Sequence, residues 1–214
     1  MSKIAVIDYG SGNLRSVVNA LKAAAHDIGR SSDVTLVSSA DDLLSAEAII
    51  LPGVGHFADC RANLQKADGM EQVLAEMVHQ KAVPFLGICV GMQMLADAGH
   101  EGEAVSGLAW ISGQVHKLQP SNTDLKIPHM GWNALSLKRP HPVTLQMADE
   151  AQVYFVHSYH FDAARDKDVV ATTDYGQSVV SIIAKDTMIG TQFHPEKSQA
   201  QGQAFLRGFL NWRP

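Results

Sequence analysis

The first hundred residues alternate short apolar runs with segments of helical hydrophobic spacing, and this alternation constrains the fold more than any other feature. Four apolar runs end in turn residues and predict buried strands: KIAVIDYG, DVTLVSS, AIILPGVG and VPFLGI. Helical spacing is found at 14–21, in ADDLLSA, from 56 to 80 with a break near Asp68-Gly69, and in CVGMQMLADA. Strands joined by helices form right-handed βαβ units, so we expect a parallel sheet with helices on both faces.

The second half of the chain has a different pattern of closely spaced strands. The strand-like stretches are GQVHKL, MGWNALSL, QVYFVHSYHF, DVVATTDYG, VVSIIAKD and MIGTQFH. Short turns between several of them predict antiparallel pairing. The last stretch, QAQGQAFLRGFLNW, returns to helical spacing. We therefore expect a single α/β domain over 1–214, with a parallel-rich central sheet, flanking helices and an added antiparallel layer.

Composition excludes several classes of protein. The 214 residues suit one α/β domain, and 46% apolar with 18% charged residues is typical of a globular chain. The net charge of -5 and the lack of a basic tract argue against nucleic acid as a partner. No apolar run reaches the roughly 18 residues that span a bilayer, and the N-terminal stretch lacks a signal-peptide pattern. We expect a cytoplasmic protein without a membrane partner.

The cysteine and histidine content predicts neither a disulfide framework nor a bound metal. There are two cysteines, Cys60 and Cys89, where a secreted disulfide-stabilised domain would use more. The ten histidines lack the paired short spacings of a zinc site. We expect free thiols, no metal and no cofactor, with Cys60 as a small buried hydrophobic residue.

Cys89 lies between two glycines where an apolar strand meets a helix-like segment. The stretch Gly87-Ile-Cys-Val-Gly91 matches G-x-C-x-G, the thiol form of a nucleophile elbow. Glycine is favoured beside the nucleophile because backbone segments approach closely there. The sulfur would sit at a helix N-terminus, whose dipole and free N–H groups favour a thiolate, and the N–H of Val90 would face a developing oxyanion. The competing interpretation is a buried cysteine between packing glycines.

A late histidine supplies the base that a cysteine nucleophile needs. In QFHPEKS, His194 follows a strand, and Glu196 lies two positions later. Residues i and i+2 of an extended chain face the same side, so Glu196 can orient the imidazole. A strand-end histidine beside a solvated glutamate is the alternative, but together with the elbow the pattern predicts the triad Cys89, His194 and Glu196.

The glycine-rich stretch LPGVGHF, which follows a predicted strand, provides a second candidate oxyanion donor. Its backbone can turn the N–H of Val54 or Gly55 inward. A plain turn and a phosphate cradle are the alternatives, although no Lys-Ser/Thr follows as it does in a P-loop.

These motifs, in this order and spacing, resemble class I glutamine amidotransferases with a Cys-His-Glu triad. The stretches are PGVGHF, GICVGMQ and QFHPEKS. Three more, DYGSGNLRSV, IPHMGWN and YFVHSYHF, narrow the resemblance to the glutaminase subunits of histidine biosynthesis. The resemblance covers nearly the full chain. It implies that Cys89 attacks the side-chain amide of L-glutamine, that a glutamyl thioester forms, and that ammonia and glutamate are released.

The resemblance also assigns further site residues. It implies oxyanion donors at Val54 and Val90, and contacts to glutamine from these positions: Gly55, Gln93 and the backbone of Ser158, Tyr159 and His160. Gln93 lies four residues beyond the nucleophile, which in a helix is the same face. A polar residue on an exposed helix face is the alternative for Gln93. The side chains of His157 and His160 are expected to pack or bind backbone.

The resemblance implies a partner. Glutaminases of this kind form a heterodimer with a (β/α)₈-barrel cyclase that receives the ammonia, and they stay nearly idle until the cyclase binds its ligand. We expect Asn13, Trp132 and Asn133 at that interface, with burial of the Trp132 side chain in the core as the alternative. Flipping the Gly53–Val54 peptide would control the second oxyanion donor. Replacing Gly53 by Val or Pro is expected to block activation without changing the fold.

Three other functions compete with this interpretation. Another class I amidotransferase or hydrolase, such as the glutaminase of pyridoxal phosphate synthesis, would share the triad but not PHMGWN. A redox-sensor or chaperone with a cysteine elbow typically lacks the His-Pro-Glu stretch. A flavodoxin-like binding domain is suggested only by the DYGSGN loop, which carries no flavin or nucleotide motif.

Overall fold

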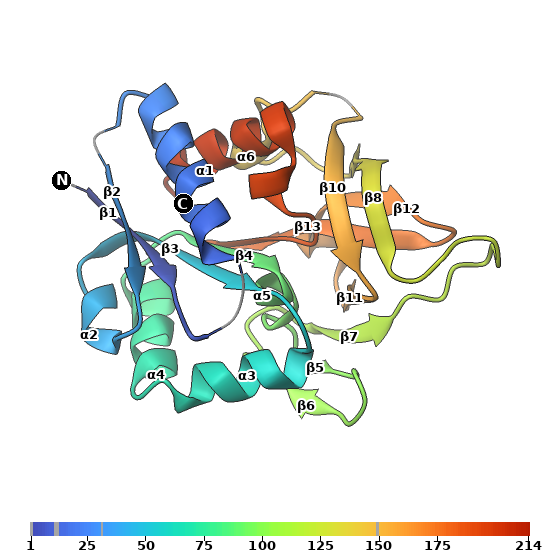
Figure 1. Ribbon diagram of the computed structural model, residues 1–214, viewed down its shortest axis with the longest axis horizontal. Coiled ribbons are helices and arrows are strands. Elements are labelled where there is room, and N and C mark those ends of the chain that lie inside the picture. Colours follow the sequence, from blue (N-terminus) through green and yellow to red (C-terminus); the bar gives the residue numbers. More distant parts are fainter. Residues whose placement is uncertain (1, 11–12, 31, 149) are drawn as a thin grey trace.

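A computed structural model describes residues 2–10, 13–30, 32–148 and 150–214, and its centre is an eight-stranded sheet (Figure 1). The strand order is β2-β1-β3-β4-β14-β13-β12-β9. In that order the strands are Ser32–Val37, Ser2–Ile7, Ala46–Gly53, Phe85–Cys89, Met188–Thr191, Ser178–Lys185, Val169–Asp174 and Ser136–Leu137. Pairing is parallel from β2 to β14 and antiparallel from β14 to β9. The α/β class and the parallel-rich sheet are therefore confirmed.

The pairing of β14 with β4 brings the two halves of the chain together. Although β14 comes about a hundred residues later, it pairs in parallel beside β4, with Gly190 opposite Gly87. Both strands therefore end at the same edge of the sheet. Cys89 ends β4, and His194 follows β14 by three residues, so the topology places both at the carboxyl ends of adjacent strands, where sites of open α/β sheets lie.

Helices cover both faces of the sheet, as the alternation predicts (Figure 1). On one face, α1 (Leu14–Asp27) packs against α6 (Gln199–Asn211). Further helices are α2 (Ala40–Leu43), α3 (Phe57–Lys66), α4 (Met70–Ala75) and α5 (Val90–Gln93), and a π-helical turn, Glu76–Gln80, continues α4. Gly69, with a left-handed φ of 67°, separates α3 from α4 and confirms the predicted break. Among the described residues, 3₁₀ turns span Pro142–Thr144, Asp166–Asp168 and Pro195–Lys197.

The helix expected after Cys89 is much shorter than predicted. α5 covers only Val90–Gln93, although the apolar spacing suggested continuation to residue 98. The carbonyls of Met94 and Leu95 accept hydrogen bonds from the amides of Leu108 and Trp110, at 2.7 and 3.0 Å. Tertiary hydrogen bonds thus replace the next helical turn, and sequence spacing does not reveal them.

The expected antiparallel layer is divided into two small sheets. One pairs β10 (Gln152–His157) with β8 (His129–Ala134). The other has the order β11-β7-β5-β6, formed by Tyr159–Ala163, Gly113–Lys117, Ala98–Gly99 and Val105–Ser106. It departs from the expected antiparallel pairing in one place, because β5 and β7 run parallel. The stretch QVYFVHSYHF is therefore not one strand, because β10 ends before Ser158 and β11 enters the other sheet.

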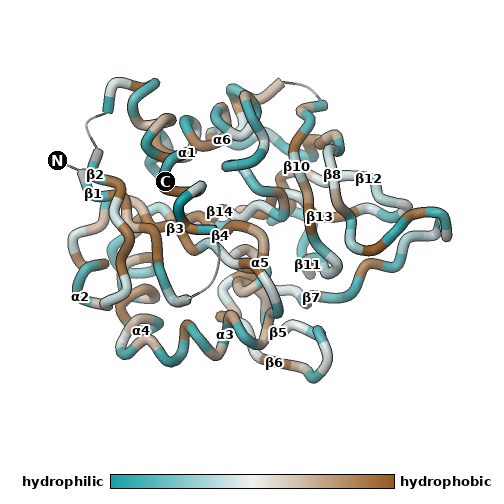
Figure 2. Tube along the Cα trace, in the orientation of Figure 1, coloured by the Kyte–Doolittle hydropathy of each residue, from teal (hydrophilic) through white to brown (hydrophobic). Residues whose placement is uncertain are grey.

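The core surrounds the central sheet. All five residues of β4 are buried, as expected for a strand covered on both faces by helices. Figure 2 shows hydrophobic residues along the neighbouring strands β1 and β3.

Within the described part of the chain, no helix has the length and hydropathy needed to cross a membrane. Two polar residues before α1 are plausible caps for this helix: Asn13 occupies the N-cap position without a side-chain capping bond, and Ser11 lies outside the described residues.

Candidate active site

Cys89 sits at a strained turn between β4 and α5. Its φ of 55° and ψ of -111° lie outside the regions favoured by residues with a side chain. A Cβ at Gly91 would lie 1.8 Å from the Leu51 carbonyl oxygen, and one at Gly87 would lie 2.6 Å from the Gly91 carbonyl oxygen. The turn therefore requires glycine on both sides of the cysteine, because backbone segments approach too closely there to leave room for a Cβ atom, as the sequence analysis expected.

The electrostatic support expected from the following helix is smaller than predicted. A helix macrodipole is the sum of aligned peptide dipoles, and α5 has only four residues. The free amides of its first turn remain, because they have no intrahelical acceptors. Val90 directly follows Cys89 and is the first residue of α5, so its N–H has no intrahelical acceptor, and a long-range helix field contributes little.

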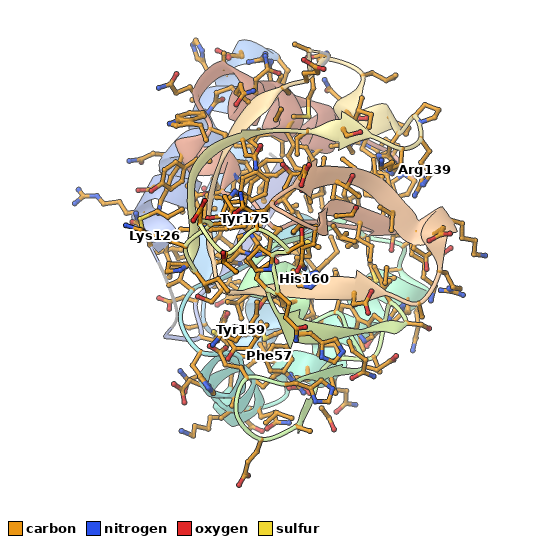
Figure 3. The ribbon with its side chains drawn as sticks, turned by 90° about the vertical axis from the view of Figure 1, so that its right-hand side faces the viewer. Phe57, Lys126, Arg139, Tyr159, His160 and Tyr175 are labelled. Carbon is orange, nitrogen blue, oxygen red and sulfur yellow. The ribbon has the colours of Figure 1, made fainter. Side chains whose placement is uncertain are left out.

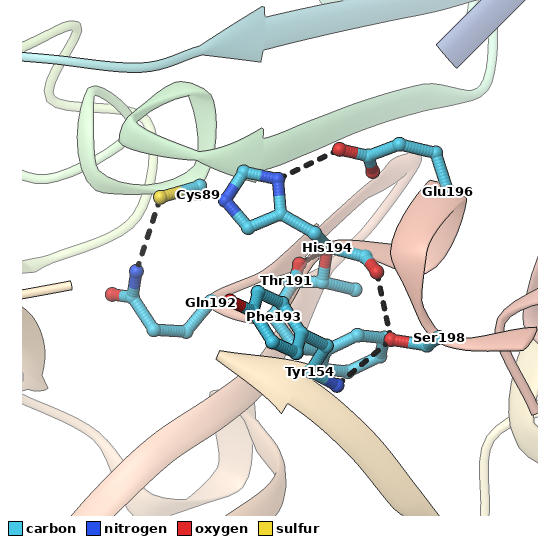
Figure 4. A network of polar contacts seen from close by, with 8 residues as sticks. All are labelled: Cys89, Tyr154, Thr191, Gln192, Phe193, His194, Glu196 and Ser198. Atoms are coloured by element: carbon cyan, nitrogen blue, oxygen red, sulfur yellow. Dashed lines mark hydrogen bonds and ion pairs between the residues drawn. The ribbon is translucent and has the colours of Figure 1, made fainter. Parts of the chain in front are cut away.

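His194 reaches the cysteine from the end of β14, and Glu196 holds its ring. The Nδ1 atom lies 2.8 Å from Oε1 of Glu196, and both side chains are buried, with 2% and 3% of their surface exposed. The backbone is also fixed: Ser198 Oγ donates to the His194 carbonyl at 2.7 Å, and the His194 amide donates to Tyr154 O at 3.0 Å. Figure 4 shows the Nε2 edge of the ring turned toward Cys89. Among the described residues Nε2 has no well-formed hydrogen bond, so it is free to exchange a proton.

The surroundings of His194 favour its protonated form. Burial alone would lower the pKa of this imidazole, but the adjacent Cys89 side chain and the Glu196 carboxylate raise the pKa to about 10. At neutral pH the ring is therefore an imidazolium, which can stabilise a cysteine thiolate and can donate a proton to a leaving group.

A cavity of about 380 Å³ opens beside the sulfur and gathers most of the predicted residues. The predicted residues that line it are Asn13, Val54, Gly55, Cys89, Val90, Gln93, Ser158, Tyr159 and His194. Four lining residues were not predicted: Glu101, Val156, His157 and Lys197. Glu196 lies behind the imidazole and does not line the cavity. The described residues contain no cluster of three histidine, cysteine or acidic side chains that suits a metal ion.

His160 lies elsewhere, on β11 next to Tyr159 (Figure 3). Its Nε2 accepts a hydrogen bond from Gln177 Nε2 at 3.0 Å, in a separate surface hollow. The structure therefore does not bring the side chain of His160 to the cavity. His157 behaves as expected of a backbone-binding histidine, with Nδ1 2.9 Å from the Tyr159 carbonyl oxygen.

Two features of the site were missed by the sequence analysis. Gln192 is fully buried, and its Nε2 lies 3.6 Å from the Cys89 sulfur. The sequence contains a signal for Gln192, because this residue precedes His194 by two positions and therefore faces the same side of the extended chain. The other feature is a pair of buried histidines, in which His129 Nδ1 lies 3.0 Å from His157 Nε2. Nothing in the sequence indicates this pairing, which depends on the register of β8 against β10.

The residues expected at a partner interface lie in different environments. The Trp132 side chain is 47% exposed on β8, so the alternative of core burial is wrong. Met130, on the same strand, is 62% exposed. Asn133 is half-buried, and its Nδ2 donates to the Asp174 carbonyl at 2.9 Å. Asn13 lines the cavity.

Two smaller expectations can be compared with the structure. A Cβ at Gly53 would lie 2.6 Å from the Gly91 nitrogen and 2.9 Å from the Val90 Cβ. The expectation that Gly53→Val leaves the fold intact is therefore wrong, because the new side chain would displace the nucleophile turn. No disulfide joins Cys60 and Cys89, which both belong to the described residues, and Cys60 is buried in α3, where its sulfur lies 3.5 Å from the Val54 carbonyl oxygen.

Comparison with known proteins identifies the class to which this fold and site belong. The family model described as glutamine amidotransferase class-I matches residues 5–212. The chain belongs to the class-I glutamine amidotransferase family, and within it to the imidazole glycerol phosphate synthase subunits HisH. It is 48% identical to the HisH subunit of Brucella melitensis biotype 1, covering 99% of this chain and 100% of the relative. It is 50% identical to the HisH subunit of Bradyrhizobium diazoefficiens, covering 99% of each.

Solved structures agree on the fold. A crystal structure of a glutamine amidotransferase superposes with a TM-score of 0.71 at 18% identity, covering 97% of this chain and 96% of the other. A glutamine amidotransferase from Thermotoga maritima gives a TM-score of 0.67 at 16% identity, covering 98% and 96%. At these identities the likeness concerns the fold alone.

Proposed function

We propose that this chain is a single-domain glutaminase that hydrolyses L-glutamine with the triad Cys89, His194 and Glu196. The single observation that carries the proposal is the buried imidazole of His194, held at 2.8 Å by Glu196 and turned toward a cysteine on a strained turn. These groups meet at a cavity large enough for an amino acid. A nucleophile, its proton-transfer partner and an orienting carboxylate are the parts that acyl transfer requires.

The reaction begins with attack of the Cys89 thiolate on the side-chain amide carbon of glutamine. A C–S bond forms, and the carbonyl oxygen becomes an oxyanion that accepts hydrogen bonds from the amides of Val90 and Val54. His194 gives its Nε2 proton to the amide nitrogen, the C–N bond breaks, and ammonia leaves a glutamyl thioester. His194 then takes a proton from water, whose oxygen attacks the thioester. The C–S bond breaks, glutamate is released, and the thiolate and imidazolium are restored.

Substrate recognition follows from the other lining residues. The amino-acid end of glutamine lies against the backbone of Ser158 and Tyr159, and Gly55 leaves room beside the reacting amide. Gln93 supports this side of the cavity, because its Nε2 donates to the Tyr159 carbonyl at 2.9 Å. The backbone of His160 extends the same strand, whereas its side chain faces away from the cavity.

The ammonia passes to a (β/α)₈-barrel cyclase subunit in a heterodimer. Ammonia released into neutral water becomes mostly ammonium, which is not a nucleophile, so a shielded route between two active sites is required. The exposed Trp132 and Met130 on β8, together with Asn133 and with Asn13 at the cavity, form the surface that contacts the barrel. The names of the relatives, subunits of imidazole glycerol phosphate synthase, support this assignment.

Glutamate release, measured for the chain alone and with the cyclase and its ligand, tests the proposal. We expect low activity alone, strong stimulation by the liganded cyclase, and loss of activity in Cys89→Ser. A glutamine-analogue alkylator should label Cys89 and leave Cys60 unlabelled. Label on Cys60, or full activity in Cys89→Ser, would overturn the triad. Stimulation by another amidotransferase partner in place of the cyclase would overturn the pairing.

A further inference from the structure

Gln192 occupies a position beside the nucleophile that the triad leaves unexplained. It follows β14, its side chain is fully buried, and its backbone N–H donates to the Ser181 carbonyl at 2.9 Å. The side-chain Nε2 lies 3.6 Å from the Cys89 sulfur (Figure 4). Sulfur is larger than oxygen, so hydrogen bonds to it are longer than those to oxygen. The side-chain amide of Gln192 is therefore within hydrogen-bonding distance of the Cys89 sulfur.

The orientation of this amide is fixed by a second glutamine. Gln93 Nε2 lies 2.9 Å from the Tyr159 carbonyl oxygen and 3.0 Å from Gln192 Oε1. The Tyr159 carbonyl can only accept, so the nitrogen of Gln93 must face it. The second N–H of Gln93 then donates to the oxygen of Gln192. Because that oxygen is occupied, Gln192 presents its NH₂ group, and not its oxygen, to the sulfur.

The sulfur needs such a donor when it is charged. Cys89 is only 4% exposed, so water cannot fully solvate a thiolate there. A buried charge is costly unless it is hydrogen-bonded. His194 can supply one donor, but it must move its proton to the leaving nitrogen during the reaction. An amide N–H cannot be transferred in this way, so a donor at Gln192 stays in place whenever the sulfur is negative.

We propose that Gln192 is a catalytic hydrogen-bond donor that stabilises the Cys89 thiolate, and that Gln93 is the positioning residue that aims it. This proposal rests on the proposed function of the site. It also changes the role of Gln93, whose two N–H donors are both occupied within the protein. Gln93 contacts glutamine through its carbonyl oxygen, or through the Tyr159 backbone that it holds, and not as an N–H donor.

The test is the pH profile of Cys89 alkylation by iodoacetamide in the full chain bound to its cyclase, with the labelled site mapped by mass spectrometry. Gln192→Met keeps the length of the side chain and removes the donor. We expect its alkylation midpoint to move to higher pH, with a rate at neutral pH that is lower by roughly 10- to 100-fold, the fold-change that corresponds to losing a hydrogen bond to a charged group. Gln93→Met keeps Gln192 but releases it, and a smaller shift in the same direction is expected. Cys60 in the same chain is the internal control for general opening of the fold.

Two results would overturn the proposal: an unchanged midpoint in folded Gln192→Met, or a shift accompanied by labelling of Cys60. If Gln192→Met does not fold by circular dichroism, Gln93→Met decides, and a wild-type profile in that variant is the overturning result. Glutamate release by the wild-type complex reports the proposed function separately. A wild-type complex without glutaminase activity but with the expected alkylation shift would remove that function and leave the Gln192 contact in place.

Discussion

Two buried corners of this molecule, one formed by Cys89, His194 and Glu196 and the other by His129 and His157, hold their histidines in different protonation states. The histidine is protonated in the first corner, and both histidines are neutral in the second. At the active site, Cys89 and Glu196 outweigh burial and raise the pKa of His194 to about 10. Between β8 and β10, burial lowers the pKa of His129 to about 4 and that of His157 to about 3. All three side chains are almost inaccessible to solvent, so burial alone does not decide the charge. The difference lies in the partners, which are a thiol and a carboxylate in one corner and neutral groups in the other.

The hydrogen bonds of the second corner show why both rings stay neutral. The Tyr159 carbonyl accepts from His157 Nδ1, at 2.9 Å, so His157 Nε2 is the acceptor for His129 Nδ1, at 3.0 Å. The Nε2 of His129 then accepts from Asn133 Nδ2, at 3.3 Å. Every ring nitrogen is occupied in one continuous direction. An added proton would have to point at an existing donor, which opposes protonation in addition to burial.

The environment of His129 is also closed by an aromatic ring. The ring of Tyr175 stacks on His129 with a centroid separation of 3.9 Å, and its hydroxyl donates to the Lys126 carbonyl at 2.6 Å. Figure 3 shows Tyr175 and Lys126 on the same side of the molecule. Phe155 stacks on His129 at 4.6 Å. These rings provide no charge that could stabilise an imidazolium, in contrast to Glu196 at the active site.

The two corners stabilise the fold in different pH ranges. His194 has a folded pKa above the unfolded value of about 6.5, so its contribution is complete below pH 6.5 and is lost as pH rises toward 10. His129 and His157 have folded pKa values below 6.5, so their contribution is present above pH 6.5 and is lost as pH falls toward 4 and 3. Taken together, the histidines favour maximum stability near pH 6.5.

The largest expected effect comes from making the active-site corner neutral. Glu196→Gln removes the carboxylate that raises the pKa of His194 and allows the ring to take the wrong tautomer. We expect glutaminase activity of the cyclase complex to fall by about 10²–10⁴-fold, the range for loss of oriented acid–base catalysis. Steady-state glutamate release measures this. Glu101→Gln, which makes the same change on another wall of the cavity, is the matched control and should have a much smaller effect. Retained activity in Glu196→Gln would show that catalysis by His194 does not depend on the negative charge of the residue that holds its ring.

The next effect concerns stability in acid. In the wild-type chain the free energy of unfolding should fall between pH 6.5 and pH 5, by as much as about 1.4 kcal/mol per pH unit for each histidine held neutral. His157→Gln removes one such group and should reduce that slope by up to about the same amount, whatever its absolute stability. His141, whose pKa burial also lowers to about 4, contributes equally to both proteins. Urea unfolding at a series of pH values gives the slope, and an unchanged slope in His157→Gln would contradict the neutral pair.

The sequence predicts these two corners unequally, for a physical reason. The proposed triad can be read from the sequence because each of its members lies in a short local pattern, the glycine-flanked Cys89 and the i, i+2 pair of His194 and Glu196. The parallel-rich sheet follows in the same way from local alternation. The His129–His157 pair depends on the register of two strands that are separated by the segment 135–151, and no spacing encodes that register. The early end of α5 was missed because it depends on tertiary contacts, in which amides from beyond residue 107 take the carbonyls of Met94 and Leu95.

The smallest expected effect comes from giving the neutral corner a charge. Asn133→Asp would place a carboxylate near His129 Nε2, where the amide now donates at 3.3 Å. An opposite charge at this distance typically moves a pKa by 1–3 units, so the pKa of His129 should rise from about 4 toward 6. Asn133 also donates to the Asp174 carbonyl, and losing that bond should cost about 1 kcal/mol of stability.

An NMR titration of the His129 ring proton measures this shift, with Asn133→Ala as the control that removes the donor without adding charge. If the pKa of His129 stays near 4 in Asn133→Asp, the buried aromatic surroundings alone hold that ring neutral. The contrast with His194 would then rest on desolvation, and the charge of the hydrogen-bonded partner would not be the deciding term. If the pKa rises in Asn133→Asp but not in Asn133→Ala, a single carboxylate moves this corner toward the behaviour of the active site.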